Sequence, residues 1–141
     1  MSRSLAAVGV SVLMSVVFAT CGSGAAGAEA GPDGRLYGSM AGEVLGDQIA
    51  AMWAVNYPNW AEADADALSL CESAHCTVLA RFVDGCGSIA AKGDVLMGGA
   101  GNTRGDAEGA AIGAFGPPDL VSMSAGLGPV VVHTECTGNA G

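Results

Sequence analysis

The stretch GCGSIAA at Gly85–Ala91 decides the fold, because it repeats an earlier stretch, LYGSMAG at Leu36–Gly42. A tyrosine stands in the earlier stretch where a cysteine stands in the later one. Two further pairs of segments match in the same order: residues 57–68 match 101–112, and residues 77–82 match 131–136. Three matches in one order indicate a duplicated unit.

The separation between matching residues changes along the chain, so the two copies differ in the length of their loops. It is 49 residues from Tyr37 to Cys86, 44 from Leu68 to Ile112 and 54 from Phe82 to Cys136. Each copy contains a short apolar segment, a second apolar run, a helical segment and a run rich in β-branched residues. The sequence therefore predicts a tandem α+β repeat of two strand-strand-helix-strand units, at residues 36–83 and 85–136.

The helix starts are the sharpest local prediction. In the first copy Asn59 is a good N-cap and Glu62, three residues later, completes a capping box. Thr103 and Asp106 stand at the matching positions of the second copy. The second helix contains Gly105, Gly109 and Gly113, so we expect it to be the weaker one.

Residues 116–129, GPPDLVSMSAGLGP, are the longest stretch without a periodic pattern. Proline and glycine at both ends favour a loop. We expect an irregular, mobile connection there.

Composition limits the function more than it identifies one. The chain has 141 residues, 23 glycines and a formal net charge of −9, with only five lysines and arginines. Nucleic-acid binding needs clustered basic residues to neutralise phosphates, so we expect neither nucleic acids nor anionic lipid surfaces as partners. No cofactor is expected.

The N-terminus has the pattern of a signal peptide. Arg3 precedes an apolar run at 5–19, which is short for a membrane span, and Ala26–Ala28 offers a cleavage site before Glu29. We predict a signal peptide at 1–28, a linker at 29–35, one domain at 36–137 and a tail at 138–141. An alternative is an envelope lipoprotein, since FATC, ending at Cys21, resembles a lipobox.

Export leaves four cysteines, and an even number in an exported small domain indicates two disulfides. Cys86 begins the first strand of the second copy and Cys136 ends its last strand. Tyr37 and Phe82 stand at the matching positions of the first copy, so we expect these aromatic side chains to pack together. Of three possible connectivities we predict Cys86–Cys136 and Cys71–Cys76.

Several of these motifs together resemble the secreted actinobacterial family of unknown function DUF4189. They include YPNWAEADADALSLC at 57–71, TVLARF after Cys76, CGSIAA from Cys86 and the glycine pair at 98–99. The resemblance covers about residues 36–137 and implies an exported α+β domain with two disulfides. Some mycobacterial relatives are associated with host interaction. Residues 42–51 and 116–129 are longer here than in the family pattern, and the family offers no catalytic residues to transfer.

Catalytic and metal-binding motifs are weak. Cys71, His75, Cys76 and Cys86 lack the paired spacing of a zinc site. His133 and Glu135 share a strand face and, with Ser88 or Ser39, could form a hydrolase triad, but no nucleophile elbow is present. The acidic residues of the first helix are typical of a solvated helix face. The glycine-rich stretch at 98–105 is typical of a turn that precedes a helix.

Three large aromatic side chains, Trp53, Tyr57 and Trp60, lie close in sequence. They either form part of a small core or provide an interaction patch. With no catalytic motif, we expect an exported, non-enzymatic binding module whose partner is a protein, acting outside the cell or at a host interface. A small extracellular hydrolase is the alternative.

Overall fold

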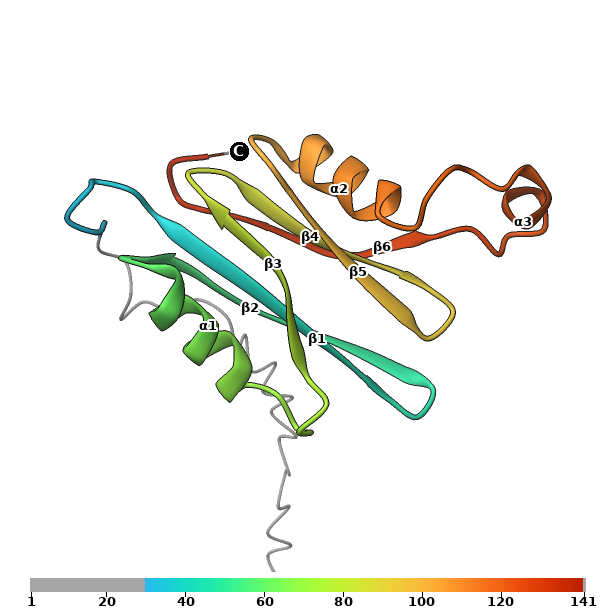
Figure 1. Ribbon diagram of the computed structural model, residues 1–141, viewed down its shortest axis with the longest axis horizontal. Coiled ribbons are helices and arrows are strands. Elements are labelled where there is room, and N and C mark those ends of the chain that lie inside the picture. Colours follow the sequence, from blue (N-terminus) through green and yellow to red (C-terminus); the bar gives the residue numbers. More distant parts are fainter. Residues whose placement is uncertain (1–29, 141) are drawn as a thin grey trace, which may run out of the picture.

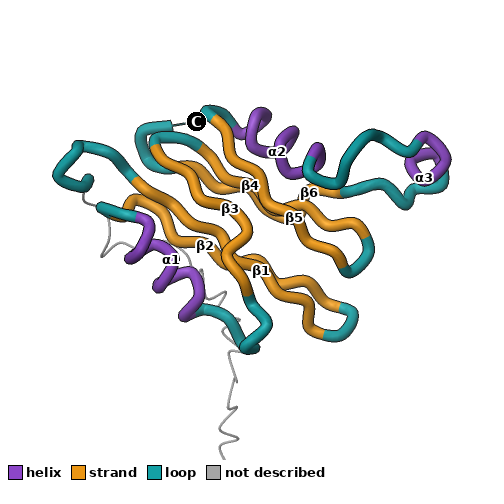
Figure 2. Tube along the Cα trace, viewed as in Figure 1, coloured by secondary structure: helices purple, strands orange, loops and turns teal. Residues whose placement is uncertain are grey.

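The computed structural model describes residues 30–140. The predicted signal peptide, its cleavage site and Cys21 lie outside this range. The described residues form six strands and three helices (Figures 1 and 2). In chain order they are β1 (Tyr37–Leu45), β2 (Gln48–Tyr57), α1 (Trp60–Ser69), β3 (Thr77–Val83), β4 (Cys86–Lys92), β5 (Val95–Gly101), α2 (Arg104–Gly113), α3 (Leu120–Ser124) and β6 (Val130–Cys136).

The strands form two antiparallel three-stranded sheets, in the orders β2-β1-β3 and β5-β4-β6. The sheets pack against each other, with β3 against β4 and β5, and β2 against β6. Helix α1 covers the outer side of the first sheet and α2 the outer side of the second (Figure 1). The α+β prediction is therefore confirmed as a four-layer arrangement of helix, sheet, sheet and helix.

The main core lies between the two sheets. Met40, Val55, Ala80, Phe82 and Ile89 are buried there. The Phe82 ring fills the space above two glycines, Gly38 in one sheet and Gly87 in the other. A Cβ atom on either glycine would lie 2.4 Å from a ring carbon. Phe82 can thus pack against both sheets because Gly38 and Gly87 have no side chains.

Small side chains bring each helix close to its sheet. Ala63 and Ala67 are the buried residues of α1, and Ala107 and Ala111 are those of α2. A Cβ atom on Gly99 of β5 would lie 2.2 Å from the Ala111 nitrogen. The high content of alanine and glycine therefore serves close backbone packing instead of a large apolar core.

Both predicted helix starts are confirmed. The Asn59 side chain accepts a hydrogen bond from the Glu62 N–H and donates one to the Glu62 carboxylate. The Thr103 hydroxyl accepts one from the Asp106 N–H. Despite its glycines, α2 has ten residues, as α1 does.

The expected packing of Tyr37 against Phe82 is wrong. The residue opposite Tyr37 is Val83, whereas Phe82 lies opposite Gly38. Because side chains alternate along a strand, this difference of one residue places Phe82 on the other face of the sheet. Tyr37 packs edge-on against Trp60 instead, with ring centroids 5.1 Å apart.

The expectation of an irregular connection at 116–129 is also wrong in part, because it contains α3. Asp119 caps this helix by accepting hydrogen bonds from the Val121 N–H at 3.1 Å and the Ser122 hydroxyl at 2.6 Å. These bonds hold the pKa of the Asp119 carboxyl below its usual value, with a smaller contribution from the positive charge of Lys92. The segment projects at one end of the molecule (Figure 1).

Candidate functional site

The clearest candidate site is an exposed apolar surface around α3. Exposed fractions reach 78% for Leu120 and 77% for Val121. Surface apolar residues are common when scattered, but several on one short projecting segment and the elements beside it indicate a binding site. We call the following set the α3 surface: Ile112, Leu120, Val121, Met123, Leu127, Val130 and Val131.

A cavity of about 310 Å³ lies beside this surface, between the second half of α2 and the segment that carries α3. Its size and apolar lining are those of a small-molecule site. The polar side chains on its wall are Lys92, Asp119 and Ser122. We call it the α2–α3 cavity, and its remaining wall is formed by Gly109, Ile112, Gly113, Phe115, Gly116, Pro117, Pro118, Met123, Gly128 and Pro129.

Sequence reasoning missed both features. Leu120, Val121, Met123 and Leu127 are apolar residues within a segment bounded by proline and glycine. That combination is a usable signal, since ordinary loops are polar. The cavity left no such signal because its wall combines the end of β4, one side of α2 and the α3 segment, which only the folded chain brings together.

The residues of the possible hydrolase triad are not assembled. The imidazole of His133 lies 3.2 Å from the Glu135 carboxylate, as expected from their shared strand face, and stacks on the Trp53 ring at a centroid distance of 4.0 Å. The Ser88 hydroxyl donates to the His133 carbonyl, not to its ring, and is fully buried. Ser88 faces α2, whereas His133 faces the other sheet.

Ser39 is likewise fully buried, on the side of the first sheet that faces α1. Its hydroxyl donates to Asp64, which also receives three N–H···O contacts from the Arg81 guanidinium, the shortest at 2.6 Å. Burial opposes ionisation of Asp64, but these bonds from Arg81 and Ser39 outweigh it and lower the pKa of the Asp64 carboxyl. The geometry ties α1 to the sheet and leaves the Ser39 hydroxyl buried.

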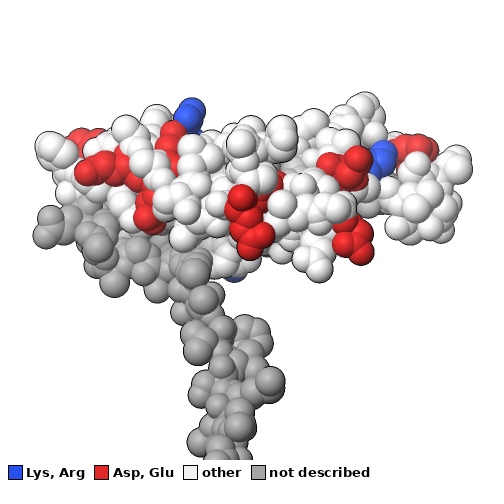
Figure 3. Space-filling view, turned by 90° about the horizontal axis from the view of Figure 1, so that it is seen from below, with Lys and Arg blue, Asp and Glu red and all other residues white. Residues whose placement is uncertain are grey.

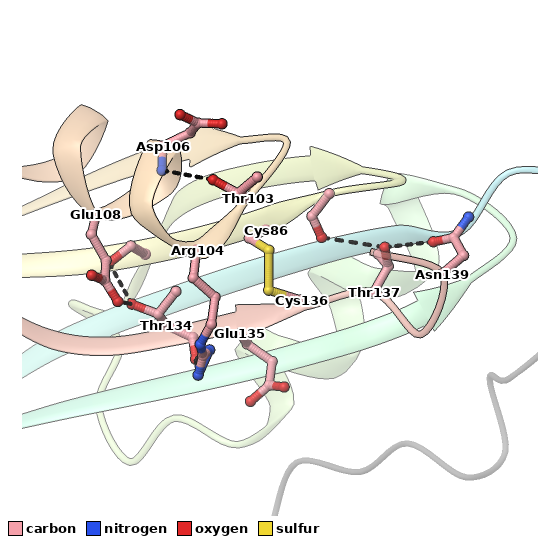
Figure 4. The surroundings of a disulfide bond; sticks show 12 residues. Cys86, Thr103, Arg104, Asp106, Glu108, Thr134, Glu135, Cys136, Thr137 and Asn139 are labelled. Carbon is pink, nitrogen blue, oxygen red and sulfur yellow. Dashed lines mark hydrogen bonds between the residues drawn. A yellow bond between two sulfur atoms is a disulfide. The ribbon is translucent and has the colours of Figure 1, made fainter. Parts of the chain in front are cut away.

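The second sheet has a polar cluster on the side that faces α2, as the first sheet has one on the side that faces α1 (Figure 4). The Ser88 hydroxyl lies 2.9 Å from the Thr134 hydroxyl, which donates to the Glu108 carboxylate of α2. Arg104 donates two hydrogen bonds to the Thr134 carbonyl, at 3.0 and 3.1 Å. These contacts hold α2 on the sheet, beside the Cys86–Cys136 bond.

Both predicted disulfides are present, Cys71–Cys76 and Cys86–Cys136. Cys86 and Cys136 are paired residues on neighbouring strands. Of the sulfurs considered for zinc, those of Cys71 and Cys76 are bonded to each other and that of Cys86 is bonded to Cys136. His75 is exposed. Next to the shorter loop, the carboxylate of Glu43 accepts hydrogen bonds from the Glu72 and Ser73 N–H groups. The Ser73 side chain, followed by the Glu72 N–H, lowers the pKa of Glu43.

The three aromatic residues of the possible patch face different surroundings. Trp53 packs against the core between the sheets, whereas Tyr57 packs against the cluster under α1. Asn56, with φ of 65°, interrupts the alternation between them. Trp60 is 40% exposed and donates to the Phe82 carbonyl. Burial, followed by the nearby Asp66 carboxylate, raises the pKa of Tyr57 to about 12.

Charged side chains are not confined to one part of the molecule. On the face seen in Figure 3, acidic side chains are scattered along the length of the molecule, and a basic side chain lies beside acidic ones near the end that carries α3. None of the helices within residues 30–140 has the length and apolar character needed to cross a bilayer.

These features define a small α+β protein stapled by two disulfides, with an apolar surface and cavity at one end. The chain belongs to the DUF4189 family, described as a domain of unknown function, whose family model matches residues 37–116. Neither the curated proteins nor the solved structures gave a match. The matched range ends where the α3 segment begins, so much of the α3 surface lies beyond it.

Proposed function

We propose that this protein is an exported, non-enzymatic binding module of an actinobacterial cell, and that its partner is a protein at the cell envelope or at a host interface. The observation that supports this is the α3 surface, where large apolar side chains are exposed on a projecting segment. Exposing them to water is unfavourable, and burying them in an interface would recover that free energy.

The test is affinity capture from envelope and host extracts with the oxidised mature protein. A variant carrying Leu120→Ser and Leu127→Ser should lose the partner that the unchanged protein retains. Leu68→Ser is the matched control, because Leu68 is 40% exposed on α1, at the other side of the molecule. Equal capture by all three proteins would contradict the role of the α3 surface.

We also propose that the mature chain is released after export and begins at Glu29. The support is the order of charge, apolar run and small residues at 1–28. Mass spectrometry of protein secreted by the native host identifies the N-terminus. A lipid-modified Cys21 would replace this proposal with the envelope-lipoprotein alternative.

We further propose that the two halves descend from one duplicated unit. The halves share the order strand, strand, helix, strand and place their first strand at the centre of the sheet. A buried serine of each central strand, Ser39 or Ser88, belongs to a polar cluster that reaches a carboxylate of the covering helix. An experimental structure in which the backbones of 37–83 and 86–136 fail to superimpose would reject this origin.

A further inference from the structure

The α2–α3 cavity has chemistry that the α3 surface lacks, because a basic side chain lies on its apolar wall. Lys92 ends β4 and is half-buried. Among residues 30–140, no carboxylate forms an ion pair with Lys92, and no acceptor takes a hydrogen bond from its ammonium group. A half-buried ammonium with three unused donors attracts an anionic acceptor more strongly than an exposed one does.

Asp119 is the other charged residue of the wall, but its carboxylate already serves α3. It accepts hydrogen bonds from the Val121 N–H and the Ser122 hydroxyl. Its separation from Lys92 exceeds that of an ion pair, so the ammonium retains room for an oxygen from outside the chain. The charge of Asp119 disfavours a head group with two negative charges and leaves one carboxylate as the better match.

The rest of the wall selects an apolar body. Ile112, Phe115, Met123 and three prolines surround a space at the small end of the range for ligand sites. The flexible Met side chain adapts to chains or rings without specific hydrogen bonds, and the Phe ring adds apolar contact area. Gly109 and Gly113 keep one side of α2 open, because a Cβ atom on either would meet nothing within 4 Å.

We propose that the α2–α3 cavity binds a small monocarboxylate with an apolar body, its carboxylate on the Lys92 ammonium and its body against Ile112, Phe115 and Met123. This is a small-molecule site, and it does not depend on a protein partner at the α3 surface.

Octanoate and 1-octanol are suitable probes, because they share a chain and differ in the head group. Titration of the oxidised mature protein, followed by calorimetry and by methyl NMR, should give saturable 1:1 binding of octanoate, with shifts at Ile112 and Met123. Octanol should bind more weakly by roughly tenfold, the loss expected for one charge-assisted contact. No saturable binding, or shifts confined to other parts of the chain, would overturn the proposal.

Gly109→Leu should block the cavity without loss of folding, since it fills open space and replaces a helix glycine with a good helix former. It should abolish binding of both probes. Gly105→Leu, in the same helix but outside the cavity wall, is the control and should leave binding unchanged. Binding that survives Gly109→Leu would contradict the location.

The head-group assignment is tested at Lys92. Lys92→Met keeps an unbranched apolar chain of similar length and removes the charge. It should therefore weaken the binding of octanoate by roughly tenfold and leave the binding of octanol unchanged. Lys92→Arg should restore most of the octanoate affinity. Equal effects of Lys92→Met on both probes would overturn the role of Lys92.

Discussion

At the scale of single residues, Phe82 shows how few large side chains hold the core. It is 3% exposed and packs against glycines of both sheets. We predict that Phe82→Ala lowers the free energy of unfolding by about 3–5 kcal/mol, because it leaves a cavity between backbones that cannot close over it. Urea denaturation measures this.

Phe115→Ala is the comparison for Phe82→Ala, since Phe115 is half-buried beside an existing cavity. Its effect should be clearly smaller. Similar losses for the two variants would mean that the space between the sheets is not the main core.

Asp64 provides the prediction on pH. Its pKa is lower in the folded protein than the ordinary value of 3.8, so the unfolded chain binds the proton more tightly. The ionised carboxylate therefore stabilises the fold above about pH 4, and this stabilisation is lost as pH falls through the folded-state pKa. Asp64→Asn should have a lower free energy of unfolding at pH 7 and a smaller decrease on acidification.

Denaturation midpoints between pH 7 and pH 2.5 measure the pH dependence. Arg81→Gln should also reduce the slope, because Arg81 donates the strongest hydrogen bonds to Asp64. Asp33, Glu43, Asp84 and Asp119 have lowered pKa values as well, so a part of the slope should remain in every variant. A slope unchanged in both variants would show that the cluster does not form in solution.

At the scale of the elements, the glycines of α2 and β5 have opposite roles. Gly109 lies inside α2, and a Cβ atom there meets nothing within 4 Å. Gly109→Ala should therefore raise the free energy of unfolding by about 1 kcal/mol through helix propensity. Gly99→Ala should lower it, because its Cβ would lie 2.2 Å from the Ala111 nitrogen and push α2 off the sheet.

Urea denaturation of the two glycine variants, side by side, checks the signs. Helix content by circular dichroism should rise with Gly109→Ala or stay constant. A loss of stability with Gly109→Ala would mean that α2 requires glycine at that position for a reason other than the packing described.

Several elements could be predicted from the sequence, because their signals are local. The runs rich in β-branched residues at 77–82 and 131–136 correspond to β3 and β6, and Asn59 and Thr103 mark the helix starts. The register between β1 and β3 could not be predicted, since a shift of one residue preserves the sequence match and changes the face of Phe82. Helix α3 was missed because five residues carry too little periodicity.

The candidate site depends on contacts that no local pattern encodes. Lys92 and Gly109 belong to elements with clear signals, yet nothing in the sequence places them on one wall with Pro129. The apolar composition of the α3 segment could indicate a binding surface, but the cavity follows from how that segment returns to β6. Fold and site therefore differ in predictability: the first rests on neighbours in sequence, the second on neighbours in space.

At the scale of the whole molecule, the two disulfides should contribute unequally. Cys86–Cys136 joins residues 50 apart and connects the neighbouring strands β4 and β6 of the second sheet. Cys71–Cys76 joins residues five apart. In the chain-entropy description, closing the longer loop stabilises the fold by about 4 kcal/mol and closing the shorter by about 2 kcal/mol. Replacing both cysteines of each pair by alanine should lower the free energy of unfolding in that order.

Loss of the longer disulfide should affect the fold more widely than loss of the shorter one. A core of small side chains leaves a margin of roughly 5–15 kcal/mol, so loss of the longer bridge removes a large part of it. The Cys86→Ala, Cys136→Ala protein should unfold at a clearly lower urea concentration and should lose protection of β4 and β6 amides from hydrogen exchange. The Cys71→Ala, Cys76→Ala protein should lose protection mainly near residues 70–77, where Glu43 holds the loop. Equal destabilisation by the two replacements would contradict the dependence on loop length.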